Sequence, residues 1–105
     1  MLLPYGFGPE RPHNYADMAR VASLGAEGVR GAGGPVFRVG HTFGLLYAVS
    51  GSSQDWARHE AGIRYALTIE LRDTGRQGFL LPASLIEQSG AEMLAGLEAM
   101  LRAVL

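Results

Sequence analysis

Hydrophobic and polar residues alternate strictly through residues 63–71, where the sequence reads Ile-Arg-Tyr-Ala-Leu-Thr-Ile-Glu-Leu. A period of two residues is typical of a β-strand, because successive side chains of a strand point to opposite faces. One face of this predicted strand is continuously apolar and is expected to pack against a covering layer. The opposite face carries Ala66 and Thr68 and then the carboxylate of Glu70, just before the strand ends.

The position of Glu70 fits a chemical role, although the strand pattern alone favours a structural ion pair. Open α/β sheets place their chemistry at the C-terminal ends of their strands, and Glu70 stands near such an end. The strand pattern alone leaves an alternative open, because structural ion pairs are also common at such places. In that alternative Glu70 pairs with Arg64 or Arg72 at a sheet edge.

Two longer segments repeat apolar residues at helical spacing. Asn14 is expected to cap the first helix, which ends in the glycine cluster of residues 31–34. Ser89 is expected to cap the last helix, with Glu92 three positions later as the partner in a capping box. The apolar face of that last helix is predicted to consist of Met93, Leu94, Leu97, Met100, Leu101, Val104 and Leu105, with Glu98 and Arg102 paired on the other face.

The shorter elements complete an alternating order of strands and helices. Short strands are predicted at residues 1–3 and 36–40, an extended or turning piece at 42–47, and a short helix at 56–61. This order predicts the α/β class: part of a mixed, mostly parallel sheet covered by helices (an α/β/α sandwich), ending in a long C-terminal helix. So few strands and helices are expected to draw part of their core from chain outside these residues.

Composition narrows the classes of partner. The 105 residues suit one domain at most, and the nine basic residues, all arginine, are balanced by ten acids. A net charge of −1 gives no electrostatic reason to expect nucleic acid or an anionic membrane as a partner. The absence of cysteine excludes disulfides and thiolate zinc sites, and no apolar run approaches membrane-spanning length.

Three familiar kinds of site are not predicted from local motifs. The glycines at 31–34 follow a helix and lack the Lys-Ser/Thr ending of a phosphate-binding loop. No serine stands in a Gly-x-Ser-x-Gly elbow, so a serine hydrolase is not expected. The histidines, none of which has a second ligand at the close spacing of a metal site, are His13, His41 and His59.

Four blocks of the sequence resemble the zinc metallocarboxypeptidases of the pancreatic and digestive A/B type. In chain order they are residues 2–7, 46–56, 62–65 and 69–84, the last reading Ile-Glu-Leu-Arg-Asp-Thr-Gly-Arg-Gln-Gly-Phe-Leu-Leu-Pro-Ala-Ser. The resemblance implies that residues 1–105 are the C-terminal part of a peptidase catalytic domain. The family's zinc ligands, a His-x-x-Glu pair and a later His, belong to the N-terminal part, which is absent from these residues.

The resemblance also implies roles for individual residues. Glu70 matches the glutamate that acts as general base toward the zinc-bound water and then delivers the proton to the leaving amine. Tyr47 matches the mobile tyrosine that closes over the bound peptide C-terminus, and Gln54 stands where the family sets its side-chain preference. The other matches are to substrate-binding positions: Leu2, Gly6, Val49, Ser52, Ser53 and Thr68 line the pocket, and Phe79 lies near the preceding subsite.

Some residues depart from the family pattern. Gln54 is neither the acid that suits basic C-terminal residues nor the bulky apolar group that suits aromatic or aliphatic ones. Gln77 replaces a common aromatic or histidine, and residues 56–62 carry one extra residue.

Two hypotheses follow from the resemblance. In the first, the chain is a fragment of a secreted digestive carboxypeptidase, with peptide C-termini as substrate, zinc as the cofactor of the complete domain, and an extracellular location. In the second, it is a non-catalytic remnant or binding module that binds no zinc and folds only with a partner, with a missing N-terminal segment, or by self-association. The isolated 105-residue chain is expected to be inactive.

Overall fold

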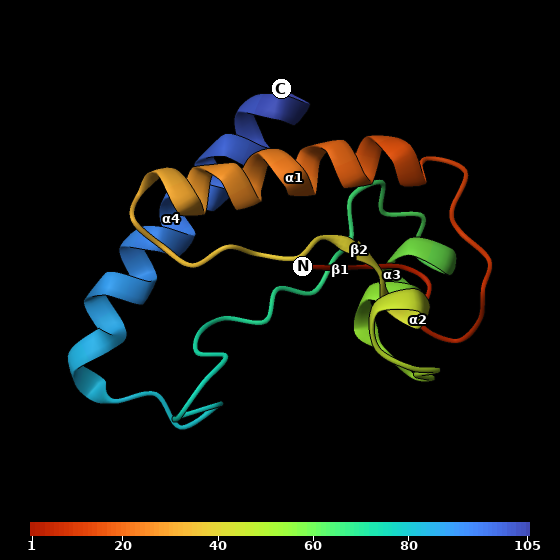
Figure 1. Cartoon of the computed structure of the whole chain (residues 1–105). Coiled ribbons are helices and arrows are strands. Elements are labelled where there is room, and N and C mark those ends of the chain that lie inside the picture. Colours follow the sequence, from red (N-terminus) through yellow and green to blue (C-terminus); the bar gives the residue numbers. More distant parts are fainter.

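Two long helices cross on one side of a small sheet, and two short helices lie together at its other side (Figure 1). The computed structural model describes all residues from 1 to 105. The elements in chain order are β1 (Leu2–Leu3), α1 (Tyr15–Gly31), β2 (Gly40–His41), α2 (Thr42–Leu45), α3 (Ser53–His59), the 3-10 turn η1 (Ala83–Leu85) and α4 (Ile86–Val104). None of the helices combines the length and the apolar character needed to cross a membrane.

The sheet is small and mixed. Strands β1 and β2 are parallel, with Leu2 opposite Gly40 and Leu3 opposite His41. Thr68 adds an antiparallel bridge to Leu2, with reciprocal main-chain hydrogen bonds of 2.8 and 3.0 Å. The α/β class, the parallel pairing and the long C-terminal helix are therefore confirmed.

The continuous strand predicted over residues 63–71 is wrong in its extent, because only Thr68 enters a ladder. A strand needs a partner along its length, and β1 offers two residues. The alternation still describes the side chains, since Tyr65, Leu67 and Ile69 pack against the core. The ends of the segment, Ile63 and Leu71, are about half exposed.

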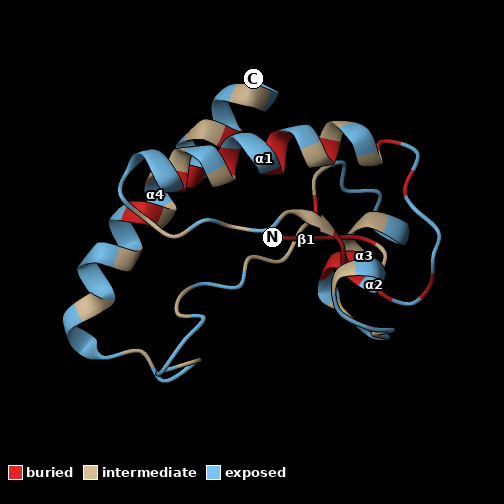
Figure 2. Ribbon diagram, viewed as in Figure 1, coloured by how far each residue is buried: buried red, intermediate tan, exposed pale blue.

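Helix α1 has the predicted bounds, and its buried face supplies most of the core. That core joins the face to the sheet and to α4 through Met1, Leu3, Met18, Val21, Ala22, Val29 and Met100 (Figure 2). Asn14 occupies the N-cap position but makes no capping hydrogen bond. Its side chain instead accepts from Arg58 and donates to the main-chain oxygen of Arg64, which ties the start of α1 to two distant segments.

Helix α4 begins three residues before the predicted cap at Ser89. The predicted capping box is wrong, because the Glu92 carboxylate accepts hydrogen bonds from Arg72 and Gln88 instead of the helix terminus. The buried positions of α4 are Glu92, Gly96 and Met100, whereas much of the predicted apolar face is exposed, including Leu94, Leu97 and Leu101. The predicted Glu98–Arg102 pair is present at 2.6 Å.

Glycines allow α1 and α4 to approach closely. A β-carbon placed at Gly28 would lie 2.8 Å from the main-chain oxygen of Ala95 and 2.9 Å from the Ala99 β-carbon. On α4, a β-carbon at Gly96 would lie 2.6 Å from a methyl group of Val29. Any larger side chain at these positions would push the helices apart.

The remaining predicted elements differ in extent or position from those expected. The strand predicted at residues 36–40 is confined to Gly40–His41, and residues 42–45 form a single helical turn, α2. Helix α3 starts at Ser53 and ends at His59, two residues before its predicted end. It carries the only tryptophan, Trp56, whose side chain faces outward and is 62% exposed.

Candidate functional site

Glu70 carries an exposed carboxylate that takes part in no ion pair. Arg64 pairs instead with Asp17 at 3.2 Å, and Arg72 pairs with Glu92 at 3.0 Å. The alternative that Glu70 is the partner of one of these arginines is therefore wrong. The side chain stands on a cavity of about 440 Å³, so its carboxylate faces open space.

The sheet places Glu70 beside Leu2. Thr68 is bridged to Leu2, and Glu70 follows two residues later along the extended chain. Glu70 therefore reaches the rim of the cavity that Leu2 also lines. The structure thus brings together three predicted site residues: Leu2, Thr68 and Glu70.

A second group of site residues gathers where α3 begins. The N–H of Val49 donates to the Gly6 oxygen at 2.8 Å, and the N–H of Gly6 donates to the Asp55 carboxylate at 2.8 Å. A β-carbon at Gly6 would lie 3.1 Å from the Val49 oxygen and 3.2 Å from a methyl carbon of Thr42. Glycine is therefore the residue that fits this close approach.

Gln54 belongs to the same group and is buried. Its amide nitrogen donates to the Thr42 hydroxyl at 2.8 Å, and that hydroxyl donates to the Leu3 oxygen at 2.8 Å. The chain of bonds fixes the orientation of the Gln54 amide and connects it to the end of β1. The Gln54 carbonyl oxygen is left buried without a hydrogen-bond partner.

Thr42 and Asp55 hold this group together, in roles that the sequence did not predict. Their partners are the main-chain groups of Leu3 and Gly6, which lie 39 and 49 positions away in the sequence. No local spacing signals a bond over that distance. The second oxygen of the buried Asp55 carboxylate has no partner, and the residue lines a cavity of about 550 Å³ beside Phe7, Trp56 and His59.

Of the other predicted site residues, Tyr47 and Phe79 stand apart from these two groups, whereas Ser52 and Ser53 adjoin the second group at the start of α3. Tyr47 is 71% exposed and Phe79 is 88% exposed, so both rings extend into solvent. Ser52 is the N-cap residue of α3, with a buried hydroxyl that has no partner, and Ser53 is exposed at the first position of the helix.

Each histidine is engaged in a separate contact. His13 accepts from Arg58, His41 lies 3.0 Å from the Glu10 oxygen, and His59 packs edge-on against Tyr5. No group of three or more His, Asp or Glu side chains in residues 1–105 could hold a metal ion.

The carboxylate of Asp17, which has a strongly lowered pKa, holds the chain segment that precedes Thr68 and Glu70. Hydrogen bonds from Tyr65, Arg20 and Arg64 hold the pKa of Asp17 at about 2, well below its usual 3.8. The Tyr65 hydroxyl donates to Asp17 at 2.6 Å, and Arg64 approaches the same oxygen at 3.2 Å. The Asp17 charge therefore joins α1 to the chain just before Thr68.

Comparisons with known proteins point to one family. The sequence pattern of the family described as zinc carboxypeptidase matches residues 1–96. The chain is 37% identical over 97 residues to carboxypeptidase B of Astacus astacus, and 40% identical over 104 residues to carboxypeptidase A4 of Mus musculus. These alignments cover 92% and 99% of this chain, but only 32% and 24% of the two relatives.

A solved structure has the same fold. The crystal structure of carboxypeptidase A from Helicoverpa armigera superposes with a TM-score of 0.85 at 28% sequence identity. The match covers 97% of this chain and 26% of the solved one. The 105 residues therefore span about a third to a quarter of the length of these relatives.

Proposed function

Because this chain belongs to the zinc carboxypeptidase family, we propose that residues 1–105 form the C-terminal part of a metallocarboxypeptidase catalytic domain. The complete enzyme removes the C-terminal residue of peptides and acts outside the cell. The names and lengths of the relatives support this proposal, since both are carboxypeptidases and both extend well beyond the matched region.

The exposed, unpaired carboxylate of Glu70 on its cavity is the observation that carries the proposal. A carboxylate in that state is free to accept a proton from the water that attacks the scissile carbonyl. As the C–N bond breaks, the same carboxyl delivers the proton to the leaving amine. General acid–base catalysis of this kind contributes about 10²–10⁴-fold to a rate.

Zinc does not fit the residues described here. None of their His, Asp and Glu side chains form a group of three that could hold it, and the three histidines are engaged in separate contacts. We therefore assign no step to a metal on these residues. In the proposed enzyme, the zinc ligands come from outside residues 1–105.

The remaining predicted residues bind the substrate in this proposal. The exposed Tyr47 ring is free to close over a peptide C-terminus, because nothing in the chain packs against most of its surface. Gln54, fixed by Thr42, provides a neutral polar group for the substrate side chain and no ion pair for a basic one. The other binding residues are Leu2, Gly6, Val49, Ser52, Ser53, Thr68 and Phe79.

A second candidate function is a non-catalytic binding module. It is favoured by the lack of a metal-holding group and by the large apolar side chains left exposed on α4. Such a module folds with a partner or by self-association, and Glu70 has no chemical role in it.

The test uses the complete protein encoded by the reading frame that contains these residues. It is assayed for release of the C-terminal amino acid from an N-blocked dipeptide. Glu70→Gln is expected to lower kcat by about 10²–10⁴-fold, because the amide cannot accept the proton. Glu98→Gln, which alters an exposed carboxylate on α4, is the control and should leave kcat unchanged.

Two results would contradict the proposal. Wild-type rates in Glu70→Gln would remove the catalytic role of that residue. Hydrolysis of the dipeptide by the pure 105-residue chain, which we expect to be inactive, would contradict the placement of the zinc ligands elsewhere.

A further inference from the structure

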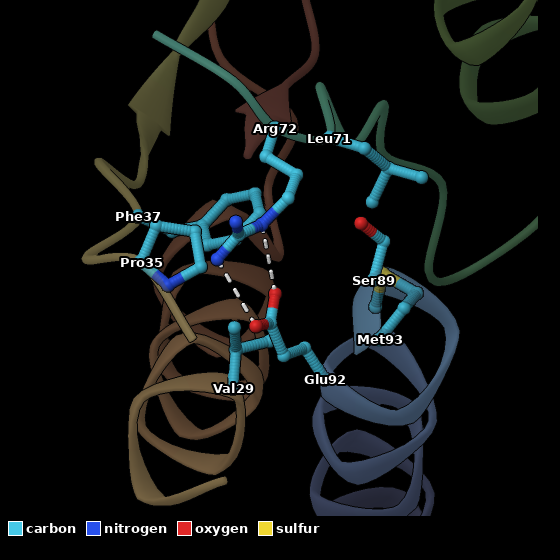
Figure 3. Close-up of a pocket in the computed structure, with 8 residues that line it drawn as sticks. All are labelled: Val29, Pro35, Phe37, Leu71, Arg72, Ser89, Glu92 and Met93. Atoms are coloured by element: carbon cyan, nitrogen blue, oxygen red, sulfur yellow. Dashed lines mark hydrogen bonds and ion pairs between the residues drawn. The ribbon is translucent and has the colours of Figure 1, made fainter. Parts of the chain in front are cut away.

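Arg72 and Glu92 form an ion pair with two parallel hydrogen bonds. The guanidinium Nε donates to Oε2 of Glu92 at 3.1 Å, and Nη2 donates to Oε1 at 3.0 Å (Figure 3). Two bonds from the rigid fork of an arginine fix an angle as well as a distance. Gln88, one turn earlier on α4, donates to Oε1 at 2.9 Å and holds the carboxylate in place.

The pair is enclosed by the protein. The Arg72 side chain is 20% exposed and the Glu92 side chain 6% exposed. The space left beside them, lined also by Val29, Pro35 and Phe37, measures about 10 Å³ (Figure 3). A water molecule needs about 10–15 Å³ of such space, so at most one could intervene. Little water can therefore reach the Glu92 carboxylate from this side, whereas Arg72 also borders the larger cavity of about 440 Å³.

The chain around Glu70 has few other supports. Residues 69–72 make no main-chain hydrogen bond, and the last bond before them is the Thr68–Leu2 bridge. After them, the Asp73 carboxylate accepts from the N–H groups of Gly75 and Gly78 at 2.9 Å, which shapes a local turn without tying it to a helix. The Arg72–Glu92 pair is thus the polar contact that anchors this stretch to α4.

We propose that the Arg72–Glu92 pair is a positioning device for Glu70. Glu70 lies midway between two anchors, the bridge two residues before it and the ion pair two residues after it. The pair sets the direction in which the chain leaves the sheet, and so sets where the Glu70 carboxylate stands on its cavity. Glu92 lies outside the cavity on which Glu70 stands, whereas Arg72 also borders that cavity, so Glu92→Gln tests the positioning role without changing the cavity wall. This inference rests on the proposed catalytic role of Glu70.

The experiment compares two variants of the complete protein, Arg72→Lys and Glu92→Gln, with Glu98→Gln as the control on the same helix. We measure kcat and KM for an N-blocked dipeptide per mole of folded protein, at a temperature well below every Tm. A displacement of about 1 Å can cost about 100-fold in rate, so kcat is expected to fall by about 10–100-fold in both variants. KM is expected to stay within about twofold for Glu92→Gln, because Glu92 does not line the cavity of Glu70 and Leu2.

Arg72→Lys keeps the experiment decisive if Glu92→Gln fails to fold. Lysine retains a positive charge beside Glu92 but loses the two-bond fork, so it changes the geometry while leaving the carboxylate neutralised. A purely structural pair would lower Tm and leave kcat per folded molecule equal to the control, which would overturn the inference. Absence of any hydrolysis by the wild-type protein would instead overturn the proposed function, so the two failures are distinguishable.

Discussion

The pair of helices α1 and α4 and the extended segment of residues 63–80 represent two different ways of holding a chain in place. The helices meet through glycines and bury Met18, Val29 and Met100 between them and the sheet. The extended segment contributes one bridge, one enclosed ion pair and a turn, and several of its apolar side chains, such as Phe79 and Leu80, are exposed.

Because of this difference, we expect the helix pair to determine mainly the stability of the fold, and the extended segment mainly the proposed activity. Segments with few buried contacts open at low free energy, whereas a packed helix pair opens with the whole molecule. Substitutions between α1 and α4 should therefore change the free energy of unfolding most. Substitutions in the extended segment should change the rate of the proposed reaction more than the stability.

The largest effect is expected on the buried face of α1, in its first turn. Met18→Ala removes a fully buried side chain and should lower the free energy of unfolding by about 2–5 kcal/mol. Leu71→Ala, at a half-exposed position in the extended segment, should cost less than about 1 kcal/mol. Urea unfolding followed by far-ultraviolet circular dichroism measures both values. An equal loss of unfolding free energy in the two variants would show that both regions contribute alike to stability.

A smaller effect is expected from closing the space between the helices. Gly28→Ala places a methyl group 2.8 Å from the Ala95 oxygen, where no side chain can move aside, and should lower the free energy of unfolding by about 1–3 kcal/mol. Gly31→Ala is the matched control, because a β-carbon there meets nothing within 4 Å. It should be neutral or stabilising by up to about 1 kcal/mol. A cost at Gly31 equal to that at Gly28 would rule out close approach as the cause.

The smallest effect concerns the contact between the two regions. The pKa of Asp17 in the folded chain, about 2, lies below the usual 3.8, so its ionised form stabilises the fold. That stabilisation is complete above about pH 4 and is lost as the pH falls toward 2. Asp17→Asn should unfold with a shallower dependence on pH across this window, as followed by acid titration. An unchanged pH profile would mean that Asp17 does not join α1 to Tyr65 and Arg64.

The sequence predicted those features that depend on neighbouring residues. Helix α1 has the predicted bounds because Asn14 and the glycines after residue 30 mark its ends locally. The apolar face of residues 65–69 was also predicted, because side-chain alternation is a local property. The placement of Glu70, Tyr47 and the other site residues in a catalytic role stays a prediction.

The features that the sequence failed to predict depend on distant partners. The extent of the strand at residues 63–71 was wrong because a ladder requires a neighbouring strand, which alternation does not reveal. Glu92 matched a capping box, yet it lies 20 positions from its true partner, Arg72. The roles of Thr42 and Asp55 were overlooked for the same reason, since their bonds reach main-chain groups of Leu3 and Gly6.

The single tryptophan determines what fluorescence can report about this molecule. Trp56 belongs to α3, which lies apart from the α1–α4 pair (Figure 1), and it is 62% exposed. Its emission therefore follows the end of the molecule that contains Gln54 and Asp55, while the ellipticity at 222 nm follows mainly the two long helices. Coincident transitions from the two signals would mean that the molecule unfolds as one cooperative unit. An earlier fluorescence transition would measure how much more easily the α3 end opens than the helix pair.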